Sequence, residues 1–120
     1  MMKKICAVFF IAFMLVSCGH GGVDNEKFVI DENSQVIDVR TEQEYKEGHL
    51  KNAINIPHVE IKNKINEYVK NKDQKIILYC RSGRRSGIAE KTLKEMGYTN
   101  VINAGAYEKL KKMESEKQKE

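Results

Sequence analysis

The clearest pattern along the chain is an alternation of short apolar runs with longer segments that are apolar on one side only. Residues 76–79 read Ile-Ile-Leu-Tyr without a polar position, which is typical of an inner strand of a parallel sheet. From Ser86 to Met96 apolar residues return at helical spacing, and Gly97 follows where a C-terminal helix cap is expected. The pattern predicts a buried strand that leads into a helix.

The other apolar positions continue this alternation. We expect further strands at 28–30, 35–39, 53–56 and 101–102, and further helices from Thr41, over 58–70 and over 106–113. Thr41 and Glu44 form the signature of a capping box. The order predicts an α/β domain of three layers, with a mainly parallel five-stranded sheet flanked by helices. Ligands of such sheets bind beyond the carboxyl ends of the strands, which is where Cys80 stands.

The N-terminal segment has a different pattern. Lys3 and Lys4 precede an apolar run from Ile5 to Val16, and small residues follow. This layout predicts a secretory signal peptide at 1–17, whose apolar core is too short for a stable membrane span. Leu15-Val16-Ser17-Cys18 also resembles the lipobox of bacterial lipoproteins, in which the cysteine is acylated and becomes the mature N-terminus. An ordinary signal peptide is the alternative.

These features divide the chain into a signal peptide at 1–17, a flexible tether at 18–27, a folded domain at 28–113 and a charged tail at 114–120. The lipobox resemblance implies a bacterial cell-envelope protein, anchored to a membrane through Cys18 and facing the periplasm or exterior. The net charge of +4 would fall with loss of the signal lysines, so composition supports no nucleic-acid partner. Nothing in the pattern requires an obligate partner, and we expect a monomer.

One thiol remains for chemistry. Cys6 would leave with the signal peptide and Cys18 would carry lipid, so Cys80 has no partner in a compartment where disulfides form. The residues after it are small, polar or basic: Arg81, Ser82, Gly83, Arg84, Arg85 and Ser86. A glycine turn, the N–H groups of a helix start and three arginines all favour a thiolate and a bound anion. A structural cysteine beside a basic surface patch is the alternative.

Four segments together resemble a single-domain rhodanese, a thiosulfate:cyanide sulfurtransferase. They are Val36–Arg40 with Glu44-Tyr45 and Gly48–Leu50, then Ala53–Pro57, Tyr79–Ser86, and Gly97–Val101 with Ala104–Ala106. Two features depart from the family pattern. Gly105-Ala106 stands where the family often has Gly-Gly before a tryptophan, and the loop lacks the Gly-Val-Thr ending of two-domain enzymes. The second departure leaves the sulfur donor open.

The resemblance implies covalent catalysis without a metal or an organic cofactor. Cys80 would take sulfur from thiosulfate as a persulfide and pass it to cyanide or a thiol, with residues 81–86 binding the substrate and the persulfide. We expect Arg85 to turn toward the site and Arg81 to lie there or at the rim. Ser82 and Ser86 would contact the persulfide or cap the helix. For Asp38 and Arg40, structural support of the loop is favoured over a catalytic role.

Other functions share parts of this pattern. A persulfide carrier that delivers sulfur to a partner protein would use Cys80 in the same way, whereas rhodanese-like binding modules commonly lack the cysteine. Cysteine phosphatases resemble Cys-x5-Arg, which requires an arginine where Ser86 stands. We expect His49 to have an architectural role. His20 and His58 have no evident partners, so the sequence predicts no metal site.

Overall fold

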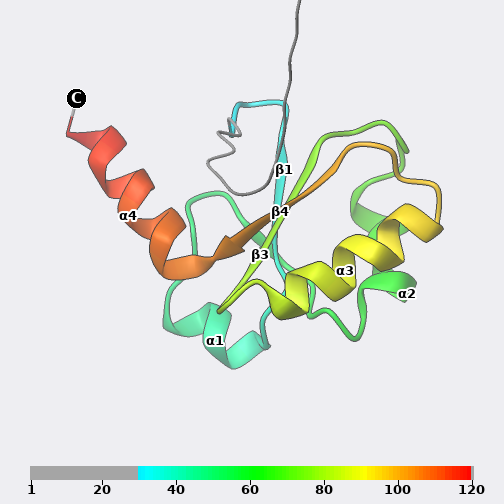
Figure 1. Cartoon of the computed structure of the whole chain (residues 1–120), viewed down its shortest axis with the longest axis horizontal. Helices are drawn as coiled ribbons and strands as arrows, with labels where there is room; N and C mark the ends of the chain where they lie inside the picture. The colour runs from blue at the N-terminus through cyan, green and yellow to red at the C-terminus, as the bar shows by residue number, and fades with distance from the viewer. Residues whose placement is uncertain (1–29, 120) are drawn as a thin grey trace, which may run out of the picture.

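The computed structural model describes residues 30–119, in which strands and helices alternate along the chain (Figure 1). The strands are β1 (Gln35–Asp38), β2 (Ile54–Asn55), β3 (Ile76–Cys80) and β4 (Val101–Ala106). The helices are α1 (Glu42–Glu47), α2 (Ile61–Tyr68), α3 (Arg84–Glu95) and α4 (Tyr107–Gln118). No helix among these residues has both the length and the apolar character that a membrane crossing requires.

The strands form one parallel sheet in the order β2-β1-β3-β4. Every residue of β3 is buried, as the unbroken apolar run at 76–79 predicts. Asp38 at the end of β1 pairs with Tyr79, so the carboxyl ends of β1 and β3 lie next to each other. The register between β3 and β4 shifts after Leu78, where Asn103 faces Leu78 and Gly105 faces Tyr79.

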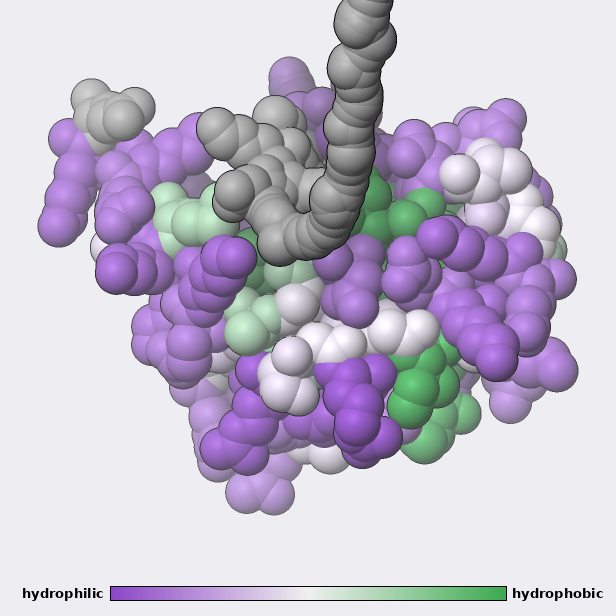
Figure 2. Space-filling model, in the orientation of Figure 1, coloured by the Kyte–Doolittle hydropathy of each residue, from purple (hydrophilic) through white to green (hydrophobic). Residues whose placement is uncertain are grey.

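Alternate residues of β3 face two separate cores, which makes the domain three-layered. Ile76, Leu78 and Cys80 pack with residues of α2 and α3, such as Ile65 and Leu93. On the opposite face, Ile77 and Tyr79 pack with Tyr45 of α1 and Leu110 of α4. Figure 1 shows the two pairs of helices on opposite sides of the sheet, and Figure 2 shows mainly hydrophilic residues over the outer faces of α3 and α4. The predicted fold class is confirmed.

Several predicted boundaries differ from the structure or lie outside it. The signal peptide, Cys18, the tether and most of the strand expected at 28–30 lie outside the described residues, and Ile30 itself is not in a strand. The described residues therefore contain four strands of the five expected.

Three helices also have different ends. The helix expected from Ser86 begins at Arg84, because the chain already turns at Gly83. The helix expected over 58–70 is shorter, because a turn after Pro57 precedes α2: the Glu60 N–H donates to the Pro57 carbonyl at 2.8 Å. The helix expected over 106–113 continues through the charged tail to Gln118, and the Glu114 carboxylate there accepts a hydrogen bond of 3.0 Å from the Lys51 N–H. This long-range contact was not visible in the local pattern.

Candidate active site

Cys80 ends the central strand, and the chain turns from it through residues 81–83 directly into α3. Gly83 makes the turn with a φ of 100°, a left-handed conformation that side chains with a Cβ rarely adopt. A Cβ on Gly83 would also lie 3.4 Å from the Cα of Gly105 in β4. The backbone conformation therefore favours glycine here, and this turn points the start of α3 back toward Cys80.

The Cys80 sulfur accepts several converging hydrogen bonds. The Gly83 N–H lies 3.0 Å from Sγ, and both the N–H and the hydroxyl of Ser86 lie 3.4 Å from it. Sulfur is a weak acceptor as a thiol and a much better one as a thiolate. The N-terminus of α3 adds the positive end of its dipole. The side chain has no solvent-accessible surface, yet these polar groups are directed at its sulfur.

Two opposing effects act on the pKa of Cys80. Burial raises it, because a charged thiolate loses its hydration. Hydrogen bonds from the Ser86 hydroxyl and from the N–H groups of Ser86, Gly83 and Ser82 lower it, and together they outweigh burial. The net pKa lies below that of an ordinary thiol. The arrangement therefore favours an anionic sulfur, whether this is a thiolate or the terminal atom of a persulfide.

Asn103 supports this loop from β4, a role that sequence reasoning missed. Its Oδ1 accepts from the Ser86 hydroxyl at 2.7 Å and from the Gly105 N–H at 3.0 Å, and its Nδ2 donates to the Gly83 carbonyl at 3.2 Å. The Ser86 hydroxyl has one proton but three acceptors within reach, namely Cys80 Sγ, Gly83 O and Asn103 Oδ1. It can therefore turn toward the sulfur when the sulfur becomes negatively charged.

The three loop arginines differ in exposure and partners. Arg81 and Arg84 are exposed and form no ion pair with the described residues. Ser82, which lies between them, is also exposed. Arg85 is partly buried and forms a bidentate ion pair with Glu44 of α1, with N···O distances of 2.8 and 3.1 Å. The sequence indicates Glu44 as a capping residue and as part of a family-like segment. Its contact with Arg85 had no local signal.

His58 also lies close enough to the loop to be affected by it. Burial lowers the pKa of His58, and the charges of Arg85 and Arg84 lower it further. Its backbone N–H donates to the Val39 carbonyl at 2.9 Å. The sequence suggested no partner for this histidine, because its proximity to the loop arises from the pairing of β1 with β2. Both effects on the pKa of His58 favour the neutral imidazole.

Asp38 and Arg40 form a separate, buried arrangement at the end of β1. The Arg40 guanidinium donates to the Asp38 carboxylate at 2.7–3.1 Å and to the Gly48 carbonyl at 2.6 Å. It also lies over the Tyr107 ring, 4.3 Å from the ring centroid. These hydrogen bonds hold the corner after α1, and none of them reaches residues 81–86. Structural support of the catalytic loop by this pair is therefore indirect.

His49 is exposed, follows α1 and packs against Tyr45 of that helix. His49 Nδ1 lies 2.8 Å from the Tyr45 carbonyl, and its ring stacks on Tyr45 at a centroid distance of 3.7 Å. Within residues 30–119, no three His, Cys, Asp or Glu side chains are grouped so that they could hold a metal ion.

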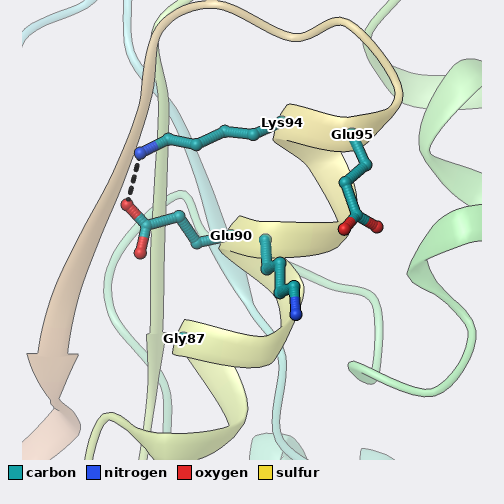
Figure 3. A pocket seen from close by; sticks show the side chains of 5 residues that line it. Gly87, Glu90, Lys94 and Glu95 are labelled. Atoms are coloured by element: carbon teal, nitrogen blue, oxygen red, sulfur yellow. Dashed lines mark hydrogen bonds and ion pairs between the residues drawn. The ribbon is translucent and has the colours of Figure 1, made fainter.

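Two hollows on the surface lie apart from the cysteine. One lies on the outer side of α3, where Lys94 extends toward Glu90 and forms an ion pair of 2.9 Å (Figure 3). The other borders α4 and includes Leu50, Leu110 and Met113. Neither contains a residue of the 80–86 loop, so the candidate site is defined by the groups that converge on the sulfur of Cys80.

The chain belongs to the rhodanese-like domain family, whose profile matches residues 24–113. It is 48% identical over 69 residues to the thiosulfate sulfurtransferase PspE of Escherichia coli, a match that covers 58% of this chain and 66% of PspE. It is 37% identical over 78 residues to YrkF of Bacillus subtilis, a candidate sulfur carrier protein, covering 65% of this chain and 41% of YrkF. The chain thus spans less than two thirds of both relatives.

A solved structure agrees with this assignment. A structure described as a rhodanese with anions from Escherichia coli aligns with a TM-score of 0.61 at 44% identity, covering 62% of this chain and 88% of the other. Together with the family profile, this similarity assigns the chain to the rhodanese-like domain family.

Proposed function

We propose that this protein transfers the sulfane sulfur of thiosulfate, through a persulfide on Cys80, to cyanide or a thiol. The observation that carries the proposal is the convergence of Gly83 N–H, Ser86 N–H and Ser86 Oγ on a single buried sulfur. Such groups stabilise negative charge at a fixed point. The name of PspE and the anions in the related Escherichia coli structure support the same chemistry.

The first half-reaction forms one sulfur–sulfur bond and breaks another. The Cys80 thiolate attacks the outer sulfur of thiosulfate, the bond to the sulfonate sulfur breaks, and sulfite leaves with the electron pair. Cys80 then carries a persulfide anion, and total charge is conserved. The exposed Arg81 and Arg84 attract the dianion. Because Cys80 has no exposed surface, loop residues must move aside as thiosulfate enters.

The second half-reaction removes the terminal sulfur. Cyanide attacks it, thiocyanate forms, and the thiolate of Cys80 is regenerated. A thiol acceptor would react as its thiolate and leave as a persulfide. Gly83 and Ser86 stabilise the anionic sulfur in each state, which supports ping-pong kinetics.

A persulfide carrier is the second candidate, and the similarity to YrkF supports it. In that function the physiological acceptor is a protein, and turnover with cyanide is slow while loading of Cys80 is unchanged. The two functions therefore share the first half-reaction and differ in the second.

We also propose that Cys18 carries a lipid and anchors the domain at the cell envelope, as the Leu15–Cys18 segment supports. Cells that express the full chain should incorporate radioactive palmitate into it, and Cys18→Ala should remove the label. Equal labelling of the two proteins would contradict this part of the proposal.

The decisive experiment is intact-mass spectrometry of the protein after incubation with thiosulfate. We expect the mass of one added sulfur atom, its loss on addition of cyanide, and release of thiocyanate. Cys80→Ser should acquire no sulfur and release no thiocyanate. Loading that persists in Cys80→Ser would overturn the assignment, and loading without thiocyanate turnover would favour the carrier function.

A further inference from the structure

Glu44 is held firmly from two directions. On its own helix it completes the capping box of α1: its Oε1 accepts from the Thr41 N–H at 3.0 Å and from the Thr41 hydroxyl at 3.1 Å. Across the molecule, its two carboxylate oxygens accept from Nη1 and Nη2 of Arg85. Paired hydrogen bonds of this kind fix orientation as well as distance. The carboxylate is therefore a fixed negative charge facing the active-site loop.

Arg85 is the loop arginine whose charge this carboxylate cancels. It is the second residue of α3, directly after Arg84, and its guanidinium lies within electrostatic range of the Cys80 sulfur. The side chains of Arg85 and Glu44 are 18% and 22% exposed, so water screens the pair only partly. Arg81 and Arg84 are exposed and have no ion-pair partner among residues 30–119. The loop therefore presents two free positive charges and one neutralised charge.

From this arrangement we infer that Glu44 determines the charge preference for the sulfur donor, by neutralising Arg85 beside the reactive sulfur. The inference rests on the sulfur transfer proposed above and concerns which anions deliver the sulfur. Glu44 does not touch the reacting atoms and acts through Arg85, so it is a specificity residue. Its effect is to limit the preference of the site for dianions over monoanions.

The physical reason is that each free charge near the sulfur stabilises a dianion about twice as strongly as a monoanion. Thiosulfate carries two negative charges, whereas an organic thiosulfonate, such as benzenethiosulfonate, carries one. Both transfer a sulfane sulfur to the same thiolate, with sulfite leaving in the first case and a sulfinate in the second. Any change in the nucleophilicity of Cys80 affects both donors, and it cancels in the ratio of their kcat/KM values.

Glu44→Gln tests this inference, because glutamine removes the charge but still suits the third position of a capping box. Steady-state kinetics with cyanide as acceptor would give kcat/KM for thiosulfate and for benzenethiosulfonate in the wild type and in the variant. We expect the ratio of thiosulfate to thiosulfonate to rise about five-fold in Glu44→Gln at low ionic strength. The rise should shrink as salt is added.

Two further variants separate charge from structure. Glu42→Gln removes the same charge from an exposed position in the first turn of α1 and should leave the ratio unchanged. Glu44→Asp keeps the negative charge on a shorter side chain. We expect kcat to fall for both donors, while the ratio of their kcat/KM values stays as in the wild type. If Glu44 had only a structural role, Glu44→Gln would lower the kcat/KM of both donors by the same factor.

The possible failures are distinguishable. An unchanged ratio in Glu44→Gln, or an equal rise in Glu42→Gln, overturns the inference but leaves the proposed sulfur transfer intact. If wild-type Cys80 accepts sulfur from neither donor in the mass measurement, the proposed function and this inference both fail.

Discussion

The carboxyl ends of β1 and β3 lie side by side and both carry arginine, but the groups at the two ends donate their hydrogen bonds to different kinds of acceptor. At the end of β1, the Arg40 guanidinium bonds only to groups of the protein, namely the Asp38 carboxylate and the Gly48 carbonyl. At the end of β3, N–H and hydroxyl groups converge on the sulfur of Cys80. Burial and positive charge are therefore shared features and do not by themselves mark a reactive site.

The two strand ends differ in whether they have groups available to bind an incoming substrate. The charges of Asp38 and Arg40 neutralise each other in an ion pair. This pair stabilises the fold and leaves no group available to a substrate. At the other end, Arg81 and Arg84 have exposed side chains, and the groups around Cys80 surround an atom that can gain a further sulfur. The comparison predicts that substitutions at the end of β1 reduce stability, whereas substitutions at the end of β3 reduce activity.

The largest expected effect on folding comes from Arg40→Met. The substitution would leave the fully buried Asp38 carboxylate without its charged partner. Breaking a buried ion pair in this way typically costs about 3–5 kcal/mol of the free energy of unfolding. Urea unfolding followed by circular dichroism should detect this loss.

Arg84→Met is the matched control, because it makes the same replacement on an exposed arginine at the other strand end. Its free energy of unfolding should lie within about 0.5 kcal/mol of the wild type. Replacing Asp38 by Asn together with Arg40→Met should recover part of the loss, because the unpaired charge is removed. Equal destabilisation by Arg40→Met and Arg84→Met would contradict the contrast between the two ends.

The next largest effect is on activity, and Ser86→Ala should reveal it. The variant loses the hydroxyl that helps to hold the pKa of Cys80 below its ordinary value, so this pKa should rise. We expect sulfur transfer near neutral pH to slow about ten-fold, the loss expected for one hydrogen bond to a charged group. The alkaline limb of the pH–rate profile should recover most of the rate, because the thiolate forms there without assistance.

Ser82→Ala provides the control for this substitution. Ser82 contributes to the lowered pKa of Cys80 through its backbone N–H, which alanine retains. Its pH–rate profile should therefore match that of the wild type. A parallel shift in both serine variants would indicate that the hydroxyl of Ser86 has no special role.

Local sequence pattern was sufficient for features that depend on neighbours in the chain. The apolar run of β3, the capping box of α1 and the loop after Cys80 are all of this kind, and they define the fold class and the reactive sulfur. The pattern could not reveal contacts between distant segments. Glu44 and Arg85 are 41 positions apart, and Ser86 and Asn103 are 17 apart. The second contact also depends on the register shift between β3 and β4.

The smallest of these effects concerns acid stability, and it tests how the two strand ends are joined. Glu44 lies on α1, which follows β1, and Arg85 lies on α3, which follows β3. The hydrogen bond from Arg85 is the largest cause that lowers the pKa of Glu44 from 4.5 to about 2. A lowered carboxyl pKa stabilises the fold above pH 4.5, and this contribution disappears as the pH falls toward 2.

Glu44→Gln should therefore be less stable than the wild type at pH 7, by about 1 kcal/mol for a partly screened pair, and equally stable near pH 2. Glu90→Gln removes one partner of the exposed Glu90–Lys94 pair in Figure 3 and should change stability by less than about 0.5 kcal/mol at either pH. Urea unfolding at several pH values measures both differences. If Glu44→Gln followed the flat profile of Glu90→Gln, the pair with Arg85 would be no stronger than a surface contact. The two strand ends would then be coupled only through the sheet.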